Sequence, residues 1–204
     1  MNLKKYLNFK NFFLTILYYL ESWILFKFFI FTKKFKTKFI HRNNLKSIHI
    51  NRNEVVNLRY LKKTILSLLD IDFKNYNFID LGCGSGVALA YVSFNFNFNK
   101  FIGYEIFEEN YMHTLDFLNA INIEIKNLDV SQLYLKKHPT ILYNFNSFSA
   151  KTLDSFISNN LKFLKETNSK LIYINAKYFD IIYKYKLNIR KLNFGIYPIL
   201  IVDF

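Results

Sequence analysis

Residues 78–86 read FIDLGCGSG, an apolar run that ends in Asp80 and continues into a glycine-rich loop. Three of the five glycines in the 204-residue chain, Gly82, Gly84 and Gly86, lie inside this loop. Glycine adopts positive φ readily and lets the backbone approach another group with no Cβ in between. We therefore expect a strand that ends at the acid, a tight loop that binds a ligand, and a helix that follows.

Three other glycine motifs can be compared with this loop. A P-loop needs Gly-Lys-Ser/Thr after four intervening residues, and the chain contains no such run. A hydrolase nucleophile elbow needs glycine two positions before its serine, whereas Cys83 stands two positions before Ser85. The dinucleotide fingerprint needs glycine where this chain has Val87. The pattern that remains is Gly-x-Gly-x-Gly preceded by an acid.

Strand and helix patterns alternate on both sides of the loop. Residues 53–71 have helical spacing, with Asn53 as the candidate N-cap. We expect further helices at 86–94, 108–120, 151–166 and 177–186, and strands at 76–81, 100–105, 121–128, 140–145, 170–175 and 196–204. This alternation predicts an α/β fold with a mostly parallel sheet covered by helices on both faces.

The glycine loop resembles the first motif of the class I S-adenosylmethionine (SAM)-dependent methyltransferases, and the resemblance extends over roughly residues 53–204. It implies a three-layer Rossmann-like sheet whose last strand is antiparallel, and SAM as the cofactor. It also implies that Gly82, Cys83, Gly84 and Gly86 form the cofactor loop. Cys83 is then a small residue that fills the turn. Asp80 is expected to position the methionine end of SAM, directly or through water.

Two later acids agree with this resemblance. Glu105 ends the second expected strand, 19 positions after Gly86, where a carboxylate can accept hydrogen bonds from both ribose hydroxyls. Asp129 ends the third strand and matches the family's adenine contact, with the Val130 N–H available to a ring nitrogen. An acid at a strand end can also simply cap a helix. Acids at three successive strand ends behind a glycine loop favour SAM binding.

The methyl acceptor is expected at the end of the fourth strand. Methyl transfer from a sulfonium needs orientation rather than an enzyme nucleophile. Asn146-Ser147-Phe148 loosely resembles the Asn-x-Phe pattern of amine methyltransferases, which implies catalytic roles for Asn146 and Phe148. The Asn146 oxygen would accept from the target N–H, and the Phe148 ring would contact the target. Family prolines are missing and Asn144 offers a competing register, so both registers stay open.

Positive charge gathers near the N-terminus. Residues 1–75 carry 15 Lys/Arg and 4 Asp/Glu, net +11, whereas residues 76–204 carry 13 and 11, net +2. We expect a basic, hydrophobic helical extension at 1–46, followed by the SAM-binding domain at 47–204. The charge favours a large anionic partner, and the Asn-x-Phe resemblance implies an amine, so we expect a nitrogen on protein or RNA as the acceptor.

The extension itself allows several interpretations. Residues 11–31 are long enough to span a membrane, but Glu21 and Lys27 interrupt them. A membrane span, binding of residues 11–39 to an anionic membrane surface, and packing on the domain all stay open. The alternative to an enzyme is a non-catalytic Rossmann-like protein that docks to membrane or nucleic acid through its basic N-terminus.

Cysteine and histidine usage narrows the location and excludes one kind of site. The single cysteine cannot form an internal disulfide, which fits a reducing compartment. We expect a cytoplasmic protein, at the inner face of a membrane if the extension binds lipid. The four histidines are scattered, so no metal site is expected.

Overall fold

The computed structural model describes residues 57–68, 71–119, 121–193 and 197–204. The predicted extension at 1–46, its membrane contact through 11–39, and the candidate N-cap Asn53 lie outside the described residues. Within the described ranges, no helix combines the length and apolar character that a membrane span requires.

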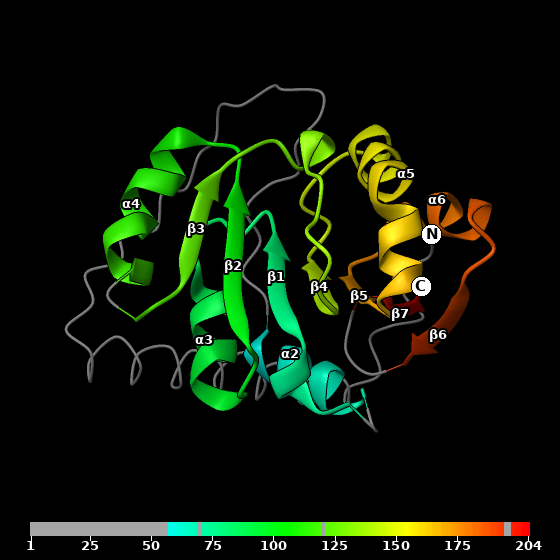
Figure 1. Ribbon diagram of the computed structural model, residues 1–204, viewed down its shortest axis with the longest axis horizontal. Coiled ribbons are helices and arrows are strands. Elements are labelled where there is room, and N and C mark those ends of the chain that lie inside the picture. Colours follow the sequence, from blue (N-terminus) through cyan, green and yellow to red (C-terminus); the bar gives the residue numbers. More distant parts are fainter. Residues whose placement is uncertain (1–56, 69–70, 120, 194–196) are drawn as a thin grey trace, which may run out of the picture.

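Strands and helices alternate around one seven-stranded sheet (Figure 1). The strands are β1 (Asn77–Leu81), β2 (Lys100–Glu105), β3 (Glu124–Asn127), β4 (Thr140–Asn144), β5 (Lys170–Ile174), β6 (Asn188–Leu192) and β7 (Ile199–Asp203). The helices are α2 (Leu58–Leu66), α3 (Val87–Asn95), α4 (Glu108–Asn119), α5 (Ala150–Glu166) and α6 (Phe179–Lys184), with short 3₁₀ turns η2 (Phe73–Asn75) and η3 (Val130–Gln132). The predicted α/β fold is confirmed.

The strand order is β3-β2-β1-β4-β5-β7-β6. β1 pairs in parallel with both β2 and β4, so the order of the chain reverses on either side of β1. In such sheets ligands bind beyond the carboxyl ends of the strands at this switch point. β7 is inserted between β5 and β6 and runs antiparallel to both, which confirms the predicted antiparallel last strand.

Helices cover both faces of the sheet, as the alternation of side chains along β1 requires. Phe78 belongs to a buried apolar cluster with residues of α2, α3 and α4. Ile79 and Leu81 belong to a second cluster, with residues of α5 and α6. Each fully buried Phe, Leu or Ile contributes about 1.5–3 kcal/mol relative to an exposed one. Asp80 lies on the same face as Phe78, near the carboxyl end of β1.

Two element boundaries differ from the predicted ones for local reasons. α2 begins at Leu58 because Asn57 is its N-cap, accepting through Oδ1 from the Arg59 N–H at 3.0 Å. β3 is shorter than the predicted 121–128, since Asn122 adopts a φ of +58° that no strand residue can have.

Candidate functional site

The glycine loop turns sharply over the carboxyl end of β2. Gly82, Gly84 and Gly86 adopt φ values of +98°, +51° and +72°, as the glycine pattern predicts. The N–H groups of Gly82 and Cys83 both donate to the Tyr104 carbonyl, at 2.9 and 2.8 Å. The loop is therefore fastened to β2, and glycine is needed for its conformation at all three positions.

Two of these glycines also lie in close contact with distant parts of the chain. A Cβ at Gly82 would lie 2.5 Å from the Ser147 Cβ, and one at Gly86 would lie 2.8 Å from Leu118 Cδ1. The loop after β4 thus rests directly on the glycine loop, and the start of α3 rests on α4. The sequence indicated close approach to a ligand, whereas the structure shows that approach to other protein segments requires glycine as well.

A fourth glycine, Gly103 on β2, makes room for the Cys83 side chain. A Cβ at this position would lie 2.9 Å from Cys83 Sγ and 2.9 Å from Leu89 Cδ2. Burial raises the pKa of the Cys83 thiol well above its usual value, and the charges of Asp80 and Glu105 raise it further. The thiol stays protonated and buried, which supports its predicted role as a small residue that fills the turn.

Asp80 is a buried carboxylate beside the glycine loop. Its side chain is 2% exposed, and no residue in the described part of the chain donates a hydrogen bond to it. Burial raises its pKa well above the usual value, and the charge of Glu105 adds to this effect. Burying such a group without a partner is costly. The same group would attract a cation such as an ammonium.

Glu105 connects β2 to the glycine loop. Its Oε2 accepts from the Gly84 N–H and its Oε1 from the Phe107 N–H, both at 2.8 Å. Burial raises the pKa of this carboxyl, and the hydrogen bonds from the backbone N–H groups partly offset that rise. The Ile106 N–H and the Asn110 side chain also lower the pKa of this carboxyl, so a ribose hydroxyl would share its oxygens with these donors. Glu105 therefore has a structural role that sequence analysis did not predict, alongside the predicted one.

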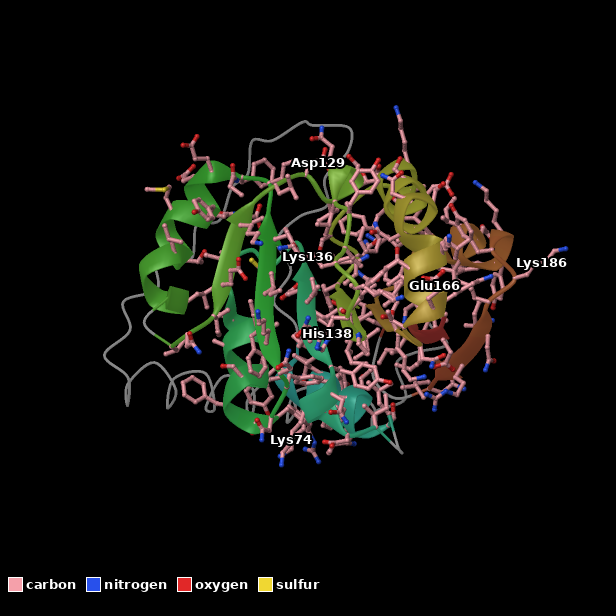
Figure 2. All side chains as sticks on the ribbon, in the orientation of Figure 1. Lys74, Asp129, Lys136, His138, Glu166 and Lys186 are labelled. Atoms are coloured by element: carbon pink, nitrogen blue, oxygen red, sulfur yellow. The ribbon has the colours of Figure 1, made fainter. Side chains whose placement is uncertain are left out.

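Asp129 lies at the carboxyl end of β3, at the same edge of the sheet as the ends of β1 and β2 (Figure 2). Its Oδ1 accepts from the Ser131 N–H at 2.8 Å and so caps η3. The adjacent Val130 side chain is buried in the second apolar cluster. The sheet order thus brings Asp80, Glu105 and Asp129 to three neighbouring strand ends, as the sequence predicts.

Both candidate asparagines lie where β4 ends: Asn144 is the last residue of the strand, and Asn146 belongs to the loop that follows. Asn144 Oδ1 accepts from the Ser147 N–H at 2.9 Å, while its buried Nδ2 has no partner among the described residues. Asn146 has a φ of +48°, is 2% exposed, and accepts through Oδ1 from the Tyr173 hydroxyl at 3.3 Å. Asn144 therefore shapes its own loop, whereas Asn146 is held by β5.

Phe148 is buried in the second apolar cluster with residues of α5. This is a core position, and contact of its ring with an acceptor stays a prediction. The sequence carries no signal for Ser147 and Tyr173, because their roles depend on contacts with residues far away in the sequence. It also gives no sign of the role of Ile106, which exposes 45% of an apolar side chain directly after Glu105.

Tyr143 and Tyr173 offer a matched pair of buried hydroxyls. The Tyr143 hydroxyl has no hydrogen-bond partner in the described ranges, whereas the Tyr173 hydroxyl donates to Asn146 and accepts from the Tyr178 N–H at 3.3 Å. We expect Tyr143→Phe to keep or raise the free energy of unfolding, and Tyr173→Phe to lower it by about 1–2 kcal/mol. Urea denaturation measures both. An equal loss of unfolding free energy in the two variants would contradict these hydrogen-bond assignments.

The described residues hold no group of three His, Cys, Asp or Glu side chains that could bind a metal ion.

No protein-family model and no curated protein sequence matches the chain. Solved structures of methyltransferases do resemble it. Precorrin-6y C5,15-methyltransferase from Geobacter metallireducens GS-15 aligns at a TM-score of 0.57 and 12% identity, over 75% of this chain and 90% of that one. The ribosomal protein L11 methylase from Lactobacillus delbrueckii subsp. bulgaricus aligns at a TM-score of 0.51 and 16% identity, over 68% of this chain and 75% of that one.

The tRNA m1A22 methyltransferase TrmK from B. subtilis aligns at a TM-score of 0.54 and 12% identity, over 70% of this chain. The aligned part makes up 64% of the TrmK chain, so this protein spans less than two thirds of that relative. At such identities the likeness establishes the fold. The described part of the chain has the fold of the class I SAM-dependent methyltransferases.

Proposed function

We propose that this protein is a SAM-dependent methyltransferase whose acceptor is a nitrogen on a macromolecule. The observation that carries the proposal is the set of three acids, Asp80, Glu105 and Asp129, at neighbouring strand ends around a loop of positive-φ glycines. Each acid suits a different part of one ligand, and their order along the sheet matches the order of those parts.

The residues fit SAM in chemistry. The buried carboxylate of Asp80, which lacks a donor among the described residues, would balance the methionine ammonium. Glu105 would accept from the ribose hydroxyls, sharing its oxygens with the backbone donors that hold it. Asp129 would accept from the adenine amine, with the Val130 N–H serving a ring nitrogen. The exposed side chain of Ile106 offers apolar surface for the base. SAM itself would supply a methyl group on a sulfonium.

Two contacts of the loop after β4, which we call the acceptor loop, support this proposal. Ser147 donates from Oγ to the Gly82 carbonyl at 3.4 Å, so the loop after β4 lies against the cofactor loop. The Tyr173 hydroxyl holds the Asn146 oxygen, which would accept from the target N–H and orient the nitrogen. The relatives' names include a tRNA methyltransferase, a protein methylase and a precorrin methyltransferase, so the fold alone does not select the acceptor.

The choice of a macromolecule rests on charge. The chain carries a formal net charge of +13, most of it in residues 1–75. Such a field attracts an extended anionic partner more strongly than it attracts a small metabolite. Contact of residues 11–39 with an anionic membrane, and a location at the inner face of a membrane, stay predictions.

Transfer of a labelled methyl group tests the proposed function. The purified full chain is incubated with methyl-tritiated SAM and separated cellular RNA and protein fractions, and label is expected in one of them. Asn146→Gly, which suits the positive φ at this position, should lower transfer by at least about tenfold with SAM affinity unchanged.

Asn95→Ala is the matched control, because Asn95 is exposed at the end of α3 and only caps its own helix through the Tyr91 carbonyl. Transfer by this variant should equal that of wild type. Wild-type transfer by Asn146→Gly would contradict the role of Asn146, and no label in either fraction would contradict macromolecular methylation.

A further inference from the structure

Basic charge within the folded domain is concentrated in one segment. Residues 76–204 carry 13 Lys/Arg and 11 Asp/Glu. Five of these basic residues and one of these acidic residues lie in the segment 177–193. The remainder of that part of the chain therefore carries eight basic and ten acidic residues, net −2. Residues 177–193 include α6 and β6, at one end of the sheet.

Two exposed aromatic rings lie in the same segment. Phe179 and Tyr183, one turn apart on α6, are 44% and 43% exposed. Their ring centroids are 6.0 Å apart in an edge-to-face arrangement. Ile182 between them is fully buried and anchors the helix to the core. Only two other aromatic residues in the described ranges, Phe94 and Tyr134, are comparably exposed.

Three exposed lysines belong to the same segment as this pair. Lys177, Lys186 and Lys191 are exposed, and none of them forms an ion pair with an acid in the described part of the chain. The Lys191 ammonium lies 5.5 Å from the centre of the Tyr183 ring. Figure 2 shows Lys186 extending outward from this end of the molecule. By contrast, Lys184 is paired with Asp154 at 2.8 Å.

The Tyr173 hydroxyl connects the start of α6 to the loop after β4. Tyr178 immediately precedes Phe179, and its N–H donates to the Tyr173 hydroxyl at 3.3 Å. That hydroxyl in turn donates to Asn146 Oδ1 at 3.3 Å. A polymer bound along α6 would therefore reach the candidate acceptor asparagine across a single tyrosine.

We propose that the α6 patch, formed by Lys177, Phe179, Tyr183, Lys186 and Lys191, binds a single-stranded segment of RNA next to the nucleotide to be methylated. Unpaired ammonium groups attract phosphates, and exposed rings stack on unpaired bases. An acidic peptide would satisfy the lysines but has no flat bases for the two rings. The identification of RNA as the methylated substrate rests on the proposed function. The binding of RNA to the α6 patch does not depend on SAM.

The test measures fluorescence anisotropy of the full chain with a fluorescein-labelled, unstructured RNA of about 16 nucleotides, between about 50 and 200 mM KCl. The double variant Phe179→Ala/Tyr183→Ala should weaken binding by about tenfold or more with an unchanged salt slope. The triple variant Lys177→Gln/Lys186→Gln/Lys191→Gln should reduce the slope of log K against log salt by about 2.

Matched controls are Phe94→Ala/Tyr134→Ala and the lysine triple Lys137→Gln/Lys151→Gln/Lys165→Gln. Both should bind this RNA much as wild type does. Equal losses in patch and control variants would overturn the proposal. So would polyglutamate binding that depends on Phe179 and Tyr183 as strongly as RNA binding does.

SAM titration of the same variants separates this proposal from the proposed function. Patch variants should bind SAM as wild type does, because no patch residue belongs to the glycine loop or to the three acids. If RNA binds through the patch while SAM does not bind, the surface stands and the methyltransferase proposal falls. If SAM binds and the patch variants bind RNA as wild type does, the methyltransferase proposal stands and the RNA-binding proposal falls.

Discussion

Gly82→Ala is expected to abolish SAM binding and to lower the free energy of unfolding by about 2 kcal/mol or more. Gly82 has a φ of +98°, which an L-residue adopts only with strain. The new Cβ would also lie 2.5 Å from the Ser147 Cβ, so either the glycine loop or the loop after β4 must move. Urea denaturation and calorimetric titration with SAM measure the two effects.

A second substitution separates the clash from the backbone strain. Ser147→Gly removes the Cβ that the new methyl group would meet, so Gly82→Ala/Ser147→Gly should recover part of the lost stability. The strain at residue 82 would remain. If Gly82→Ala unfolded at the wild-type urea concentration and bound SAM normally, the described contact between the two loops would be wrong.

Asp80→Asn is expected to raise stability at neutral pH and to weaken SAM binding by at least about tenfold. Burial raises the pKa of Asp80 in the folded state above its unfolded value, so the folded state binds the proton more tightly. The free energy of unfolding therefore falls as the pH rises from the pKa of the unfolded state to the higher pKa of the folded state. Above both values the folded protein bears the full cost of burying the charge. Asparagine removes that cost, and removes the charge that would balance the methionine ammonium.

Asp154 supplies a control of opposite sign. A hydrogen bond from Lys184 and, to a smaller extent, one from Tyr185 lower the pKa of Asp154. Its contribution to stability is therefore present at neutral pH and is lost on acidification. Asp154→Asn should therefore unfold more easily at neutral pH and bind SAM normally. Thermal unfolding across the pH range measures both variants. A fall in stability for Asp80→Asn at neutral pH would contradict the assignment.

The centre of the fold could be predicted from sequence because its determinants are local. The run that ends in Asp80, the positive-φ glycines after it and the helix from Val87 follow one another directly along the chain. Glu105 was predictable because it ends β2, and Asp129 because it closely follows the alternating segment that contains β3. Parallel strands then place their carboxyl ends at one edge.

Other features depend on contacts that spacing does not encode. The hydrogen bond of Ser147 to Gly82 joins residues 65 positions apart, and that of Tyr173 to Asn146 joins residues 27 apart. β6 was not predicted as a strand because it lies at the sheet edge with mostly exposed polar side chains, so its apolar alternation is weak. The structural role of Glu105 was missed for the same reason as that of Ser147.

Titration of the full chain with SAM by calorimetry tests the central claim most directly. Wild type is expected to bind one SAM, and Asp129→Ser to bind it at least about tenfold more weakly. Serine retains the N-cap acceptor that Asp129 gives to Ser131, but is too short to reach the adenine amine, so the unfolding midpoint without ligand should hold. No heat of binding from folded wild-type protein, or equal affinity in the two proteins, would contradict the account.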